Sequence, residues 1–234
     1  MVPADVSWSH ATNTLSALDG ALASSVAFIE ADLSFDDGLV FMAHDPDDVP
    51  SRAARQDAAF PAWMSRLLTN TSTATCPGVK LDFKSAQAVH LVVTHLETLA
   101  MNTPVWLNAD VLVGPRGRSP PAHDARQFIR ECLRLPSAVP SLGWTTGPPG
   151  HPLGYTSHMI DEMTTLCKAS QLMDVHVTFP VRAVDALAAP PEIYRLLDTS
   201  PFWTVTVWCG PEGANRDDIL NAFDPRRTYV DVHP

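Results

Sequence analysis

Acidic side chains occur inside runs of the sequence that are otherwise apolar. Glu30 and Asp32 belong to the run at residues 26–32, and Asp82 belongs to the run at residues 78–83. Residues two apart on a strand share a face, so Glu30 and Asp32 are expected to point the same way. A buried carboxylate is costly unless it is protonated, paired or bound to a cation. Three such groups meeting at one place therefore predict a hard divalent cation, Mg²⁺ or Ca²⁺, held by oxygen ligands.

Two histidines and a lysine follow runs of the same kind. His10 and His44 each end an extended stretch, and Lys84 stands two residues after Asp82. Imidazoles beside a bound cation are typical of proton transfer to and from a substrate that the cation polarises. Lys84 adds a charge that binds an anion, and the combination favours a phosphodiester as the substrate. Lys80, in contrast, is expected to lie outside the sheet, against a helix or solvent.

Further polar and aromatic residues stand at the expected carboxyl ends of strands and are candidates for substrate binding. Each alone has a simpler interpretation, because a polar residue there often caps a helix and a tryptophan often packs in a core. As a set they would supply a positive charge for an anion and two aromatic walls against the leaving group. These candidates are Asn108, Asp110, Trp144, Arg182 and Trp208.

Short runs rich in apolar and β-branched residues predict about eight strands. Between them apolar residues recur every three or four positions, as at Leu15, Leu18 and Leu22, which predicts helices. This alternation indicates a parallel sheet, and eight strands are the number of an α/β (β/α)8 TIM barrel. We expect a single barrel domain over residues 1–234. The predicted strands are residues 6–10, 26–32, 78–83, 104–110, 139–144, 175–180, 203–208 and 228–232.

An open doubly wound sheet is the alternative α/β arrangement. It often has a glycine-rich first turn, whereas residues 10–13 read His-Ala-Thr-Asn. In a barrel, the active site is built at the carboxyl ends of the strands. The barrel therefore predicts that candidate residues from distant parts of the sequence come together.

The amino-acid composition is typical of a globular protein, and its charge limits the kind of partner the protein can bind. The 234 residues include 26 acidic and 16 basic side chains, and they contain no run of Lys and Arg, so we expect no nucleic acid partner. No apolar stretch reaches the about 18 residues that span a bilayer, so no transmembrane segment is expected. The first residues lack the pattern of a signal peptide. We therefore expect a cytoplasmic monomer, or a secreted protein if a signal has been removed from the sequence.

The order of the candidate residues resembles a known superfamily. His10, Glu30-Ala31-Asp32, His44-Asp45 and Asp82-Phe83-Lys84 resemble the motif of the glycerophosphodiester phosphodiesterases and spider sphingomyelinases D, which are PLC-like barrels. Longer segments spread over nearly the whole chain resemble the menorin (dendrite-branching protein) family. Those segments are residues 8–13, 79–84, 105–110, 141–146 and 177–183.

The resemblance implies a role for each residue of the motif. Glu30, Asp32 and Asp82 would hold the divalent cation, His10 and His44 would be the catalytic pair, and Lys84 would bind a phosphate oxygen. For a phosphodiesterase of this kind we expect a glycerophosphodiester or a lysophospholipid as the substrate. The attacking hydroxyl is either water, which gives hydrolysis, or a neighbouring hydroxyl of the substrate, which gives a cyclic phosphate.

One position departs from the glycerophosphodiesterase pattern. That pattern has an arginine directly after the first histidine, where this sequence has Ala11. Asn13 resembles the residue of the sphingomyelinase D branch and is a further candidate for substrate binding. The substrate preference of either branch is therefore not carried over to this chain.

Two other classes of function are alternatives. The first is a catalytically silent barrel that acts as a protein- or glycan-binding interaction module, since a fold does not determine a function. The second is an unrelated barrel enzyme, an aldolase or isomerase, in which Lys84 forms a Schiff base. Its acidic neighbours would keep Lys84 protonated, and the complete set of motif residues favours the phosphodiesterase over both alternatives.

Overall fold

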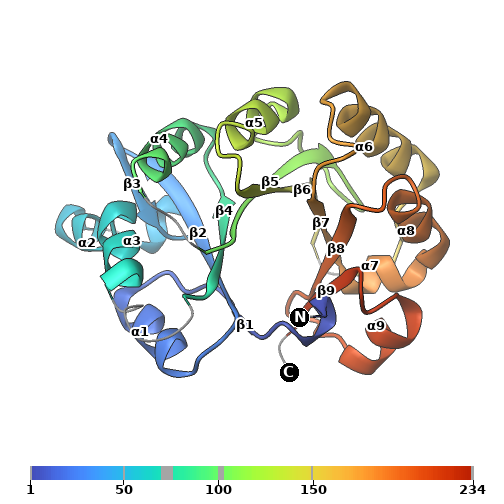
Figure 1. The fold of residues 1–234 in the computed structure, drawn as a ribbon, viewed down its shortest axis with the longest axis horizontal. Coiled ribbons are helices and arrows are strands. Elements are labelled where there is room, and N and C mark those ends of the chain that lie inside the picture. The colour runs from blue at the N-terminus through green and yellow to red at the C-terminus, as the bar shows by residue number, and fades with distance from the viewer. Residues whose placement is uncertain (1, 50, 70–75, 100–102, 149, 233–234) are drawn as a thin grey trace. The chain divides into compact units, whose positions relative to one another are not determined.

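Parallel strands make up most of the sheet. The computed structural model describes residues 2–49, 51–69, 76–99, 103–148 and 150–232. The strands are bonded in the order β1-β2-β4-β5-β6-β7-β8-β9. The pairs from β1 to β5 and from β6 to β9 are parallel, and β3 is an antiparallel partner of β2. The strands (Figure 1) are β1 Trp8–Ser9, β2 Phe28–Asp36, β3 Leu39–Met42, β4 Gly78–Phe83, β5 Val105–Val113, β6 Ala138–Thr145, β7 Val177–Arg182, β8 Trp203–Trp208 and β9 Thr228–Asp231.

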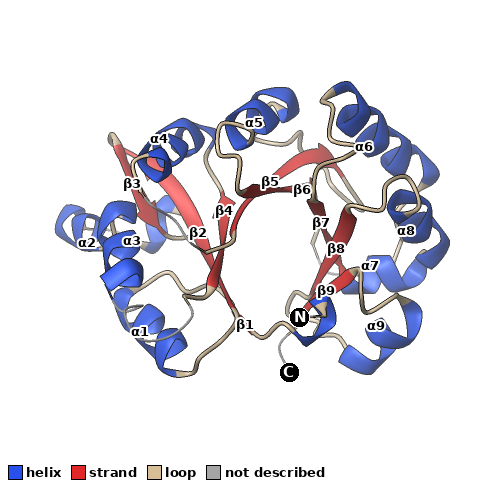
Figure 2. Cartoon of the chain, viewed as in Figure 1, coloured by secondary structure: helices blue, strands red, loops and turns tan. Residues whose placement is uncertain are grey.

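Helices alternate with these strands along the chain (Figure 2). This alternation with a parallel sheet is the α/β arrangement of a (β/α)8 TIM barrel, so the fold class predicted from the sequence is confirmed. The helices are α1 Leu15–Ala23, α2 Arg52–Asp57, α3 Phe60–Thr69, α4 Ala86–Glu97, α5 Ala125–Cys132, α6 Ser157–Ala169, α7 Ala183–Ala188, α8 Pro190–Leu197 and α9 Arg216–Ala222, with short 3₁₀ helices η1 Pro3–Asp5 and η2 Pro46–Asp48.

Residue contacts divide the chain into two compact units. We call Ser7–Asn108 together with Arg130–Val139 the site unit. The second unit comprises Met1–Val6, Ala109–Ile129 and Pro140–Pro234. Each is described by itself, and the single domain over residues 1–234 stays a prediction.

The helices of the site unit include two that the sequence pattern did not predict. Residues 51–69 form α2 and α3, and α3 buries an apolar face that includes Phe60 and Trp63. The Trp63 indole Nε1 donates a hydrogen bond of 2.9 Å to the Thr12 carbonyl. This bond holds the loop that follows β1, so α3 supports the segment that carries His10.

An aromatic cluster packs around the start of β2 and β4. The Phe28 ring lies 5.0 Å from the Trp8 ring and 4.6 Å from the Trp106 ring, measured between centroids. Gly78 pairs with Phe28 across the two strands, and a Cβ at this position would overlap the Phe28 ring. Since the two tryptophans hold that ring from other sides, only glycine leaves it enough room.

Gly78→Ala is therefore expected to lower the free energy of unfolding by about 1–3 kcal/mol, because the added methyl must displace a packed ring. Gly20→Ala in α1 is the matched control. Outside its own helix backbone and chain neighbours, no atom of the described residues lies within 4 Å of a Cβ at Gly20, so alanine should raise the free energy of unfolding by about 0.5–1 kcal/mol. Urea denaturation measures both changes, and equal effects of the two substitutions would contradict the packing of Phe28.

The second unit has its own core around β7, β8 and β9. The Phe179 and Trp203 rings meet edge to face at 5.2 Å, and both side chains are fully buried. The amino-terminal segment joins this unit, since Ala4 N–H donates to the Pro225 carbonyl at 3.1 Å. Among the described residues, none of the helices is long and apolar enough to cross a membrane.

Candidate functional site

Strand register in the site unit brings the predicted carboxylates together. Asp32 on β2 is the direct partner of Asp82 on β4, and Asp82 is the partner of Asn108 on β5. Glu30 lies two residues before Asp32, on the same face of β2. One oxygen from each of Glu30, Asp32 and Asp82 lies within 4.8 Å of the others. We call these three residues the carboxylate cluster, and their predicted convergence is confirmed.

Hydrogen bonds orient each member of the carboxylate cluster. The Ala11 N–H donates to Glu30 Oε2 at 2.8 Å. The Asn13 amide donates to Asp32 Oδ2 and accepts from the Asp32 N–H, both at 2.8 Å. Asn108 Nδ2 donates to Asp82 Oδ1 at 2.7 Å. Asn13 and Asn108, expected to bind substrate, therefore hold the carboxylates in this structure.

The backbone after β1 is bent to reach the carboxylate cluster. Ala11 has a φ of 50°, in the left-handed region that alanine seldom adopts. This conformation accompanies the bond from its N–H to Glu30. Strained backbone of this kind is concentrated at functional sites, where neighbouring contacts compensate for it. Ala11, at the position where the related motif has arginine, thus contributes its backbone N–H to the site rather than a side chain.

Two lysines balance part of the negative charge. Lys84 Nζ lies 2.6 Å from Asp82 Oδ2 and 3.1 Å from Asp32 Oδ1. Lys80 is 4% exposed and is the strand partner of Glu30. The prediction that Lys80 lies outside the sheet is wrong, because residues two apart on a strand share a face and Lys80 therefore points the same way as Asp82.

The protonation of the carboxylate cluster follows from burial and charge. Burial and the neighbouring charge of Asp32 raise the pKa of Glu30 to about 7. Burial also acts to raise the pKa of Asp82, but Lys84 and Lys80 outweigh it and hold that pKa at about 2. Burial disfavours the charged amine of Lys84, yet Asp82 and Asp32 keep its pKa above the ordinary value. Glu30 therefore takes up a proton far more readily than Asp82 does.

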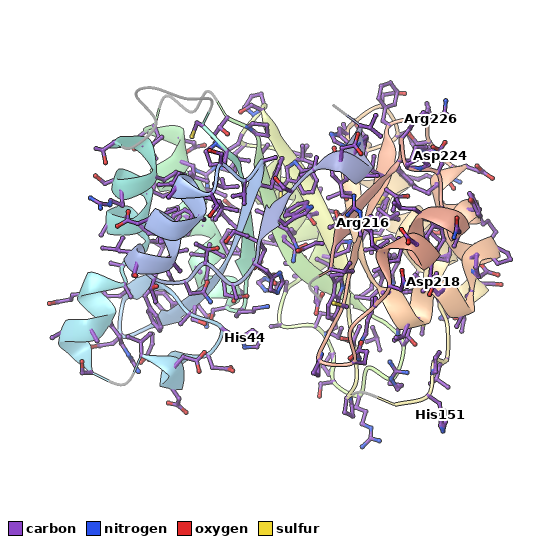
Figure 3. The ribbon with its side chains drawn as sticks, turned by 90° about the horizontal axis from the view of Figure 1, so that it is seen from below. His44, His151, Arg216, Asp218, Asp224 and Arg226 are labelled. Carbon is purple, nitrogen blue, oxygen red and sulfur yellow. The ribbon has the colours of Figure 1, made fainter. Side chains whose placement is uncertain are left out.

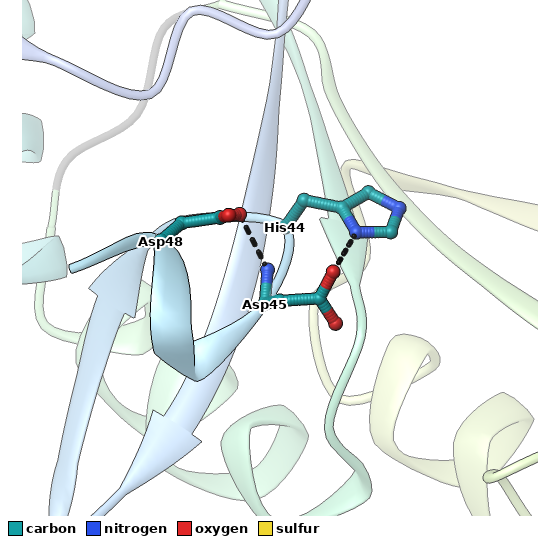
Figure 4. Close-up of side chains that lie close together, drawn as sticks. All are labelled: His44, Asp45 and Asp48. Carbon is teal, nitrogen blue, oxygen red and sulfur yellow. Dashed lines mark hydrogen bonds and ion pairs between the residues drawn. The ribbon is translucent and has the colours of Figure 1, made fainter. Parts of the chain in front are cut away.

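The two predicted histidines belong to different groups of side chains. His10 Nδ1 lies 3.5 Å from Glu30 Oε2, so His10 adjoins the carboxylate cluster. His44 projects from the loop after β3 (Figure 3) and pairs at 3.0 Å with Asp45, whose N–H donates to Asp48 (Figure 4). The backbone links this loop to the cluster, since the N–H of Ala43 donates to the Asp32 carbonyl at 3.1 Å.

Comparison with known proteins agrees with these motifs. Residues 3–234 match the family model described as the Menorin N-terminal domain. The chain belongs to the menorin family. It is 32% identical over 245 residues to Protein FAM151B from Homo sapiens, covering 98% of this chain and 83% of that protein. The resemblance of the longer segments to menorins is therefore confirmed, and the carboxylate cluster is part of a menorin chain.

The remaining candidates for substrate binding lie in the second unit. They are Asp110, Trp144, Arg182 and Trp208. Arg182 is 3% exposed, and its guanidinium lies 5.8 Å from the Trp208 ring centroid. Trp144 is buried with its Nε1 unpaired among the described residues, while Asp110 is exposed at the end region of β5. Their role in substrate binding stays a prediction.

Glu212 is a partner that the sequence analysis missed. Arg182 Nε and Nη2 donate to the two Glu212 oxygens at 2.6 and 2.7 Å. These hydrogen bonds hold the pKa of Glu212 at about 2. Glu212 lies in a loop 30 residues further along the chain, so no local pattern could have indicated the pair, whereas the two-residue spacing of Lys80 and Asp82 was a usable signal.

The pair makes stability depend on pH. Because the pKa of Glu212 is lower in the folded chain, its stabilisation is present above the ordinary value of 4.5 and is lost as the pH falls toward about 2. Glu212→Gln should lower the free energy of unfolding by about 1–2 kcal/mol at pH 7, with a smaller difference at pH 3. Urea denaturation at both pH values measures this.

Asp218→Asn on α9 (Figure 3) is the control for Glu212→Gln, since Asp218 is exposed. It should change the free energy of unfolding by less than about 0.5 kcal/mol at either pH. A Glu212→Gln effect that is the same at pH 7 and pH 3 would show that the charge of Glu212 does not contribute.

Proposed function

We propose that this menorin-family chain is a phosphodiesterase that depends on a divalent cation. One observation carries the proposal: the buried carboxylates of Glu30 and Asp32 and the half-buried carboxylate of Asp82 converge beside Lys84 and the imidazole of His10. Perturbed titratable groups gathered in this way are characteristic of functional sites. A purely structural role would not require so much negative charge within one sheet.

The donor set of the carboxylate cluster fits Mg²⁺ or Ca²⁺. Its oxygens are hard ligands, and one oxygen from each of the three carboxyl groups lies within 4.8 Å of the others. Glu30, Asp32 and Asp82 would hold the cation. A cation bound there supplies charge that stabilises the negative phosphoryl oxygens during reaction.

The histidines would move the protons of the reaction. The hydroxyl that attacks phosphorus, from water or from the substrate itself, gives its proton to one imidazole as the new oxygen–phosphorus bond forms. The other imidazole gives a proton to the leaving oxygen as its bond to phosphorus breaks. Glu30 and Asp45 would orient His10 and His44 for these transfers, since each carboxylate lies beside one ring.

Lys84 and the asparagines complete the proposed site. The Lys84 side chain is 27% exposed, so its ammonium can meet a phosphate oxygen while it remains beside Asp82. Asn13 and Asn108 keep Asp32 and Asp82 in place. The substrate we propose is a glycerophosphodiester or a lysophospholipid-like phosphodiester.

Removing one histidine tests the catalytic assignment. His10→Ala should lower kcat on a chromogenic phosphodiester, bis(4-nitrophenyl) phosphate, by about 10²–10⁴-fold, because proton transfer then falls to water. His158→Ala is the matched control, since its imidazole is exposed on α6. Equal activity of the His10→Ala variant and the wild type would refute the assignment, and no turnover by the wild type, tested on lysophospholipids as well, would favour a binding module.

Cation binding can be measured without any substrate. Mg²⁺ or Ca²⁺ at about 100 times its Kd should stabilise the wild type by about 2.7 kcal/mol, seen as a rise in Tm. Asp32→Asn should abolish most of that rise because it removes one ligand charge, whereas Asp218→Asn should retain it. A rise that is the same in all three proteins would place the cation outside the carboxylate cluster.

A further inference from the structure

A cavity of about 460 Å³ opens beside the carboxylate cluster within the site unit. Its volume lies in the range of about 300–1,000 Å³ that small-molecule sites occupy. Among the described residues, nine line the cavity and six of these are apolar. The six come from α1, from β3 and the loop after it, and from the end of η2 through α2. They are Leu15, Met42, Ala43, Val49, Ala54 and Ala58.

Two residues that line the cavity also bond to Asp32 of the carboxylate cluster. Asn13 lines the cavity and also bonds Asp32 through its amide. Ala43 lines it as well, donates its N–H to the Asp32 carbonyl and directly precedes His44. A molecule whose charged group lies at the carboxylate cluster can therefore extend into this cavity.

The walls of the cavity are held in place by Arg55 on α2. Arg55 Nε donates to the Val49 carbonyl at 2.7 Å, and its Nη2 donates to the Pro46 carbonyl at 3.1 Å. The same guanidinium pairs with Asp36 and lies 5.3 Å from the Phe41 ring centroid. Such a network indicates a built cavity rather than a chance gap between loops.

Charge and exposure decide what the cavity accepts. Asp48 lines the cavity and its carboxylate repels an anion, so the phosphate of a substrate is not expected on this side. Leu15 is 37% exposed there and would bury apolar surface against an apolar ligand. We propose that the cavity binds the alkyl or acyl chain of the phosphodiester substrate, an inference that rests on the proposed function for its phosphate end.

The test compares substrates that differ only in chain length. The methyl and decyl esters of 4-nitrophenyl phosphate are used below the micelle concentration. In the wild type, kcat/KM should rise by about fourfold for each methylene that becomes buried. Ala54→Trp fills the cavity and should reduce the decyl-to-methyl ratio to about one. Ala53→Trp is the matched control on the same exposed helix and should keep the wild-type ratio.

Several outcomes would overturn the inference. If the decyl-to-methyl ratio of kcat/KM is near one in the wild type, the alkyl chain of the substrate does not bind in the cavity. The same conclusion follows if Ala54→Trp keeps the wild-type ratio. If Ala54→Trp does not fold, as judged by its thermal melt, Ala58→Phe replaces it, since this side chain also lines the cavity.

A binding measurement separates this inference from the proposed function. If neither ester is turned over, the phosphodiesterase proposal fails, and calorimetry with decyl phosphate and methyl phosphate decides the role of the cavity. If decyl phosphate binds more tightly than methyl phosphate, and Ala54→Trp removes this difference, the cavity is the binding site of the alkyl chain. Equal binding of both phosphates overturns it.

Discussion

Negative charge buried within an apolar sheet is the constraint on which the site depends. Glu30 and Asp32 are almost completely buried, and Asp82 lies beside them. Such charge is tolerated only with counter-charge and hydrogen-bond donors, which here come from two lysines, two asparagines and the Ala11 backbone. Burial and the neighbouring charge of Asp32 nevertheless raise the pKa of Glu30 to about 7, so Glu30 takes up a proton far more readily than Asp82 does.

The same constraint explains why register matters more than any single side chain. Asp32, Asp82 and Asn108 meet because three neighbouring strands pair residue by residue at that level. A slip of one residue would turn the whole set to the other face of the sheet. Support also comes from outside the sheet, since Trp63 of α3 holds the loop that carries His10.

The second unit follows the same rule of paired charge. Arg182 is bonded by Glu212, and the fully buried Asp185 accepts from Arg116 at 2.7 Å and from the Leu153 N–H at 3.1 Å. Each pair joins a distant loop to a regular element, since Arg182 ends β7 and Asp185 lies in α7. Membership of the menorin family does not by itself identify the reaction. The reaction must be argued from the site, because one fold supports many activities.

Periodicity in the sequence by itself determined every described strand except β3, most of the described helices and the face on which Glu30 and Asp32 lie, since the spacing of apolar residues sets what is buried. The two-residue spacing of Lys80 and Asp82 also indicated that both side chains share a face of β4, although we predicted otherwise for Lys80. Only the tertiary structure decided which charges meet. The Arg182–Glu212 pair and the apolar cavity both depend on contacts between distant segments. The spacing of residues along a strand determines which face of the sheet a side chain lies on. The packing of distant segments determines which charged group lies beside it, and the pKa of a charged group depends on that neighbour.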